Sequence, residues 1–325
     1  MHAPQTPQDL SQQLGWRSAI AGAVLWVVFA LALNPTLPGT SWAELELFFA
    51  VLVLVPIGLA LCVPTTWTSL RAWRVACALQ PLAATTLILS WTAPAGPTAF
   101  LLALPWFALT SFAGFLGLAR MRRRGFRPPG ESCVDVALLS IAVGGIWTLL
   151  SRRAALPLDW HYSDMLAEAA YFQGVSFLIL LATGLASPRF SSTFAAWSQV
   201  SVLGGFAAVL FLRCSALIGP SAMPNAWADI LTMISCLVCA GLQAWGAYRV
   251  TAHGALRLLW GLSALYLLAG ASLGLFKALG AAMQGGVASP KFVLEGRFVL
   301  PGFALAAVIA WNLARRAKPA ELPNR

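Results

Sequence analysis

Apolar stretches long enough to cross a lipid bilayer recur along the whole chain. At about 1.5 Å per residue, an α-helix of roughly 20 residues crosses a hydrocarbon core about 30 Å thick. Backbone groups in lipid need partners within their own segment, which favours helices. We therefore predict an all-α, polytopic transmembrane helical bundle of about ten spans. The predicted spans cover approximately 18–34, 47–63, 73–91, 99–119, 134–151, 165–186, 196–218, 227–248, 256–280 and 292–313.

The composition supports a membrane protein. Of 325 residues, 59% are hydrophobic and 10% are charged, a balance that a water-soluble core of this length does not need. The net charge of +10 is carried by short basic clusters between the apolar spans, as is typical of topology determinants. We therefore expect the lipid bilayer, and not a nucleic acid, as the partner of these charges.

The distribution of charge predicts the orientation. With the amino terminus in the cytoplasm, fifteen of the 21 Lys and Arg residues lie on the cytoplasmic side and seven of the 11 acids lie outside. Cytoplasmic segments of membrane proteins carry an excess of Lys and Arg, so this orientation is strongly favoured. An even number of spans also returns the carboxyl terminus to the cytoplasm. We predict a short cytoplasmic leader at 1–17, one transmembrane domain at 18–313 and a basic cytoplasmic tail at 314–325.

Charged side chains gather near the predicted outer ends of the spans. Charges at a membrane border are costly unless they pair or line a wet cavity, so their concentration predicts an outward-facing polar pocket. In the sixth span, Asp164, Glu168 and Tyr171 share one helical face, whereas Gln173 lies elsewhere on the helix. Glu168 has two interpretations: a functional carboxylate, or a partner for Arg152 or Arg153.

Other candidates have structural alternatives. We expect Glu44 to be solvated and Glu46, beside the apolar run, to be the better pocket residue. Arg213 and Glu295 lie near span ends, where ion pairing between helices is the alternative to a ligand contact. The deeper Trp106 and Trp147 are candidates to line a cavity, although core packing is favoured. Gln80 precedes Pro81 and is expected to bond a broken helix or a neighbouring span.

Several classes of chemistry lack their motifs. His2, His161 and His253 fall on different sides of the predicted topology, which excludes histidine-rich metal chemistry. Cys236 and Cys239 form a CxxC inside an apolar helix, where packing of free thiols is favoured. No P-loop, nucleophile elbow or dinucleotide fingerprint occurs in a suitable context. We predict no metal and no cofactor, which leaves acid–base chemistry or ligand handling.

Five segments resemble a known family. They are LELFFAVLVLVPIGLAL at 45–61, ALPWFALTSFAGFLGL at 103–118, GGIWTLLSRRAALPLDW at 144–160, YFQGVSFLILLATGL at 171–185 and LEGRFVLPGFALAAVIAW at 294–311. Together they resemble the bacterial YndJ-like membrane proteins, a family without an established biochemical activity whose members are sometimes labelled transporters. The resemblance implies a multi-pass protein of the cell inner (cytoplasmic) membrane.

The chain departs from the family pattern at two places. Tyr171 and Gln173 replace a histidine pair separated by one residue, and Glu295 precedes Gly296 where the pattern has His-Gly. These changes remove groups that bind metals or carry protons near neutral pH, but leave acid, donor and acceptor functions. The resemblance implies a pocket role for a set of residues spread over four spans. They are Glu46, Trp147, Arg152, Tyr171, Gln173 and Glu295.

Three functions remain in competition. The first is binding or transport of a small or lipophilic molecule in the outer pocket. The second is an intramembrane acid–base enzyme of the isomerase or terpene-cyclase type, with a carboxylic acid as proton donor and aromatic rings around a cation. The third is a structural or accessory role. The candidate proton donors or carriers are Glu46, Glu168 and Glu295, and the candidate substrate-binding residues are Trp106, Trp147, Arg152, Tyr171, Phe172, Gln173 and Arg213.

The predicted orientation is testable with fusion reporters. Green fluorescent protein fused after Arg325 should fluoresce, and alkaline phosphatase at the same position should be inactive, because that end is predicted to be cytoplasmic. The same reporters fused after Trp160, in a predicted outer segment, should give the opposite pattern. Reversed activities at both positions would contradict the orientation.

Overall fold

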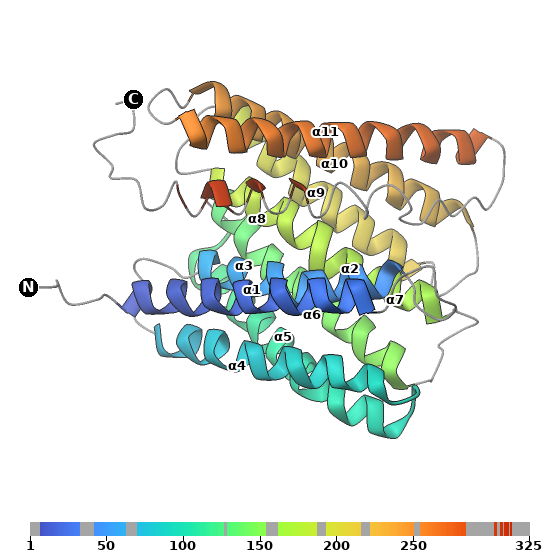
Figure 1. Cartoon of the computed structure of the whole chain (residues 1–325). Helices are drawn as coiled ribbons and strands as arrows, with labels where there is room; N and C mark the ends of the chain where they lie inside the picture. Colours follow the sequence, from blue (N-terminus) through green and yellow to red (C-terminus); the bar gives the residue numbers. More distant parts are fainter. Residues whose placement is uncertain are drawn as a thin grey trace, which may run out of the picture. The chain divides into compact units, whose positions relative to one another are not determined.

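The computed structural model describes most of the chain as helix (Figure 1). The described residues are 7–32, 42–62, 70–126, 129–153, 162–186, 193–215, 222–249, 254–283, 302–303, 306–307, 309–311 and 313. The regular structure in this part is entirely helical, which confirms the all-α prediction. Within it, nine helices are long and apolar enough to cross a membrane, and they coincide with the first nine predicted spans. The predicted span at 292–313 lies largely outside the described residues.

The elements follow one another with short connections. In order they are α1 (Pro7–Ala32), α2 (Trp42–Phe49), the π-helical η1 (Ala50–Leu54), α3 (Val55–Cys62), α4 (Leu70–Leu89), the 3₁₀-helical η2 (Ser90–Thr92), α5 (Pro97–Arg124), α6 (Pro129–Arg153), α7 (Tyr162–Ala170), the π-helical η3 (Tyr171–Ser176), α8 (Phe177–Ala186), α9 (Thr193–Ser215), α10 (Ala222–Arg249) and α11 (Gly254–Met283).

The chain divides into two compact units. The first unit comprises Met1–Arg120 with Leu138–Leu178, and the second comprises Met121–Ala137 with Ile179–Arg325. In the second unit α10 packs along both α9 and α11, and Arg213 of α9 forms an ion pair of 2.5 Å with Asp229 of α10. All six cysteines are free thiols, as the sequence predicts. The expectation of a single transmembrane domain stays a prediction.

The continuous helix α2–η1–α3 forms the core of the first unit, where it packs against α1, α4, α7 and η3. Its sequence is almost wholly apolar. All residues of its most apolar stretch are buried, compared with 17% of the residues in the corresponding stretch of α1. Elsewhere, large apolar side chains such as Leu101 and Phe115, each 64% exposed, cover the outer helix faces. Such surfaces suit contact with lipid tails, and not with water.

Proline and π-helical geometry free two carbonyls in this core helix. The N–H of Val55 donates to the carbonyl of Ala50, so the carbonyl of Val51 loses its usual α-helical partner. Pro56 has no N–H, so an α-helical bond to the carbonyl of Leu52 cannot form either. The π-helical segment η1 ends at Leu54, two residues before Pro56.

Neighbouring helices accommodate these carbonyls. Gln80 Nε2 of α4 donates to the Val51 oxygen at 2.9 Å, and Ser18 Oγ of α1 donates to Gln80 Oε1 at 2.8 Å. Gln80 therefore bonds a neighbouring span, as predicted. The other π-helical segment, η3, packs beside η1, and Ser140 Oγ of α6 donates to its Phe172 carbonyl at 2.7 Å. Inside a bilayer such partners must come from the protein itself.

Gly22 allows α1 to approach the Leu52 carbonyl closely. A Cβ atom at position 22 would lie 2.1 Å from the Leu52 oxygen, which belongs to the backbone and cannot rotate away. Glycine at this position therefore sets the distance between α1 and the core helix.

Substituting this glycine should destabilise the protein. Gly22→Ala should lower the apparent melting temperature in detergent, because α1 must move away from η1 at a cost of about 1–3 kcal/mol. Gly204→Ala in α9 is the matched control, since a Cβ atom there meets nothing within 4 Å. We expect the control to match or exceed wild type. Equal melting temperatures for the two variants would contradict the close contact.

Candidate functional site

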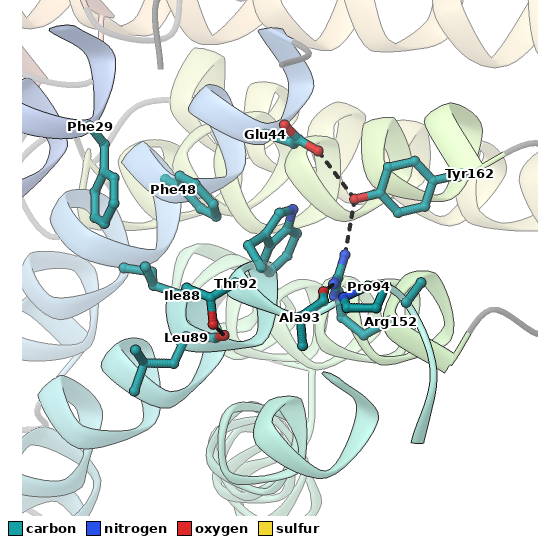
Figure 2. Close-up of a pocket in the computed structure, with 12 residues that line it drawn as sticks. Phe29, Glu44, Phe48, Ile88, Leu89, Thr92, Ala93, Pro94, Arg152 and Tyr162 are labelled. Carbon is teal, nitrogen blue, oxygen red and sulfur yellow. Dashed lines mark hydrogen bonds between the residues drawn. The ribbon is translucent and has the colours of Figure 1, made fainter. Parts of the chain in front are cut away.

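A cavity of about 520 Å³ lies in the first unit (Figure 2). Its wall comes from α1, α2, the end of α4 with the following turn, the end of α6 and the start of α7. The lining residues are Phe29, Glu44, Phe48, Ile88, Leu89, Trp91, Thr92, Ala93, Pro94, Ala95, Arg152 and Tyr162. The helix ends that meet here are those that the charge distribution predicts to lie outside.

Arg152 holds the turn between α4 and α5. Its Nη2 donates to the carbonyls of Ser90 and Ala93, at 2.7 and 2.9 Å. Its own carbonyl accepts the N–H of Gly96 at 2.9 Å. The guanidinium also lies over the Trp91 ring, 4.5 Å from the centroid. Because the Arg152 side chain is only 4% exposed, these contacts replace water around its charge.

Tyr162 connects Arg152 with Glu44. Arg152 Nη1 donates to the Tyr162 hydroxyl at 3.2 Å, and that hydroxyl donates to Glu44 Oε1, also at 3.2 Å (Figure 2). Burial, followed by the nearby Glu44 carboxylate, raises the pKa of the Tyr162 phenol above its ordinary value. The phenol therefore stays protonated at neutral pH and retains its proton for the bond to Glu44.

The remaining wall is apolar and rich in aromatic rings. Phe48 lies edge-on to Trp91, with ring centroids 5.0 Å apart, and 5.9 Å from the Phe29 ring. Ile88 and Leu89 line the cavity from α4. One end of the cavity is thus a hydrogen-bonded chain of Arg152, Tyr162 and Glu44, and the rest suits a hydrocarbon group.

The position of Glu44 corrects the sequence-based expectation. Glu44 is not solvated: it is 9% exposed and lines the cavity, whereas Glu46 is not among the lining residues. Glu44 and Phe48 are four residues apart and share a helical face, while Glu46 points to another side. The spacing of Glu44 and Phe48, together with Trp91 at the end of α4, was the sequence signal that could have identified this part of the cavity wall. Tyr162, Trp91 and Phe29 were not selected as site residues, while Arg152 was.

The other candidates of the first unit are buried, but they do not line this cavity. Gln173 Nε2 donates to Thr148 Oγ1 at 3.0 Å, and the Tyr171 and Phe172 rings meet edge to face at 5.0 Å. The candidate acids Glu46 and Glu168 are 8% and 2% exposed. The functional roles of these residues, and those of Trp106 and Trp147, stay predictions.

The remaining two candidates are separate from this cavity's lining. Arg213 belongs to the second unit, where its bond to Asp229 is the interhelical ion pair considered as its alternative role. Glu295 lies outside the described residues. Among the described residues, no group of three or more His, Cys, Asp or Glu side chains is arranged to hold a metal ion.

Fold and site together define a multi-pass helical membrane protein with an amphipathic cavity at the ends of its helices. The chain belongs to the YndJ-like protein family, whose model matches residues 46–293. That range includes Trp91, Arg152 and Tyr162, begins two residues after Glu44, and ends before Glu295. No curated protein and no solved structure matches the chain.

The two adjacent arginines at the end of α6 give a direct test of the site's architecture. Arg152→Lys should lower the apparent stability by about 1.5–3 kcal/mol, because an ammonium cannot reproduce the planar set of charge-assisted bonds. Arg153→Lys should have little effect, since Arg153 is exposed and its guanidinium lies 5.9 Å from the Phe100 ring. The measurement is thermal unfolding of both purified variants. A larger loss for Arg153→Lys would show that Arg152 does not organise the turn.

Proposed function

We propose that this protein binds a small amphipathic molecule in the cavity and handles or transports it at the outer face of the membrane. The observation that carries the proposal is one cavity that combines an aromatic, apolar wall with the Arg152–Tyr162–Glu44 chain. Sites for small molecules are typically apolar clefts of about 300–1,000 Å³ with a few placed polar groups. At about 520 Å³ the cavity falls within that range.

The elements around the apolar wall favour a ligand that partitions into lipid. Phe29 belongs to α1 and Leu89 to α4, and both helices expose large apolar side chains such as Leu31 (78%) and Leu82 (63%). Under the predicted topology these faces contact the bilayer. A molecule dissolved in the outer leaflet therefore reaches the apolar wall without crossing water, with its polar end toward the membrane surface.

The acid–base enzyme has less support. It requires a proton-donating carboxylic acid and aromatic rings around one cavity. Glu46 and Glu168, the described acids selected for that role, do not line this cavity. Glu44 does line it, but its carboxylate accepts a hydrogen bond from Tyr162, an arrangement that suits ligand recognition.

A pair of leucine substitutions on α4 tests ligand binding. Leu89, although 46% exposed, lines the cavity, so Leu89→Trp should obstruct it; Leu82, 63% exposed, does not line it, so Leu82→Trp adds the same indole away from the cavity. Wild type and Leu82→Trp should co-purify with an amphipathic molecule enriched over bulk lipid, measured by mass spectrometry of organic extracts. Leu89→Trp should lose most of this enrichment. If all three proteins carry the bulk lipid composition alone, the proposal fails.

A further inference from the structure

We infer that the molecule bound in the cavity carries a neutral hydroxyl head group, which takes the place of the Tyr162 hydroxyl between Arg152 and Glu44. The inference rests on the proposed function and narrows it to one class of ligand, a hydroxyl-bearing lipid.

The lengths of the hydrogen bonds distinguish a fixed side of Arg152 from an exchangeable one. The two bonds from Nη2 to the turn are 2.7 and 2.9 Å, within the usual range. The Tyr162 hydroxyl donates to Glu44 at 3.2 Å, longer than the usual O–H···O distance of about 2.7–2.8 Å, and it accepts from Arg152 Nη1 at 3.2 Å, at the long end of the range for N–H···O bonds. The turn therefore holds the guanidinium in place, while the bond to the phenol is the longest that the guanidinium makes and occupies a position that a ligand oxygen can take.

The number of hydrogen-bond donors on Arg152 also favours a ligand that carries an acceptor oxygen. A guanidinium has five N–H donors in total. Two of them serve the turn and one serves Tyr162, whereas the buried Nε has no hydrogen-bond partner among the described residues. A buried, charged donor without an acceptor is costly. A ligand oxygen that reaches Nε, in addition to the bond from Nη1, is accordingly stabilised.

The charges of the cavity select among oxygen-bearing groups. Among the described residues, Arg152 and Glu44 are the charged side chains that line it, and their formal charges are opposite. A carboxylate or phosphate accepts from Arg152 but meets the Glu44 carboxylate. An ammonium donates to Glu44 but cannot accept from Arg152. A hydroxyl does both, as the Tyr162 hydroxyl does in the structure.

The apolar wall sets the rest of the ligand. Phe48, Phe29 and Leu89 continue from the polar end along the cavity, and the Trp91 ring closes one side of it. A hydrocarbon chain attached to the hydroxyl would bury its surface there, which supplies most of the affinity in such sites.

A series of probes with one chain length and different head groups tests the inference. Radiolabelled 1-hexadecanol, hexadecanoate and hexadecylamine are equilibrated with the full chain in nanodiscs, with empty nanodiscs as the correction for partitioning. Saturable binding of 1-hexadecanol should be at least about tenfold tighter than that of either charged probe, because a site with paired polar groups rejects ligands that leave one of them unpaired. Equal or tighter binding of hexadecanoate would overturn the inference.

Two variants make the test specific. Tyr162→Phe should tighten 1-hexadecanol binding about fivefold, because the phenol no longer competes for the same hydrogen bonds. Glu44→Gln should increase hexadecanoate binding about tenfold, since an uncharged amide no longer repels the carboxylate. Thermal unfolding checks that both variants remain folded. Unchanged or weaker 1-hexadecanol binding by folded Tyr162→Phe would refute the exchange of hydroxyl groups.

The cavity-filling variants separate this inference from the function on which it rests. If all three probes bind equally to wild type and Leu82→Trp but not to Leu89→Trp, the cavity binds hydrocarbon chains and the hydroxyl specificity is refuted. If Leu89→Trp binds every probe as wild type does, both the inference and the proposed function are refuted. Alcohol-selective binding that disappears only in Leu89→Trp supports both.

Discussion

The first unit depends on satisfying backbone carbonyls inside an apolar environment. Its core helix gives up regular α-helical bonding at η1, where Val55 bonds Ala50 and Pro56 offers no N–H to Leu52. The amide of Gln80 bonds the Val51 carbonyl, and Gly22 lets α1 lie close against the Leu52 carbonyl. Lipid supplies no such partners, so these contacts also fix which helices surround the core.

Backbone carbonyls also find partners within the protein at the site. Arg152 donates to the carbonyls of Ser90 and Ala93 in the α4–α5 turn and accepts from Gly96 through its own carbonyl. One side chain therefore closes a turn and presents a charge to the cavity. A fixed guanidinium loses little conformational freedom when a ligand binds, which is the condition for selective recognition by few polar groups.

The sequence predicts the helices far better than the site. Length and hydrophobicity locate nine of the predicted spans, because burial in lipid requires only an apolar run of sufficient length. Arg152 was selected because charges at span ends are unusual and because the family resemblance favoured it over Arg153. Glu44 was expected to be solvated, but it is buried and lines this cavity, because adjacency to the apolar run ignores helical direction and two residues turn a helix by more than half a revolution. The pocket role of Glu46 stays a prediction. Tyr162 and Trp91 are far apart in the sequence, so only their convergence in the folded chain gives them a place in the cavity wall.

The phenol between Arg152 and Glu44 explains how a buried pair of opposite charges remains available to a ligand. A tight, direct ion pair satisfies both groups and leaves little to gain from another partner, whereas removing one member of such a pair is strongly unfavourable. A bridging hydroxyl bonds both groups at 3.2 Å, so the link between Arg152 and Glu44 runs through a neutral oxygen. A ligand hydroxyl in this place forms the same two bonds to Arg152 and Glu44, and the cost of the exchange is that the Tyr162 hydroxyl gives up both. Selectivity arises because a neutral hydroxyl accepts from Arg152 and donates to Glu44, whereas a charged head group satisfies one of these residues and not the other.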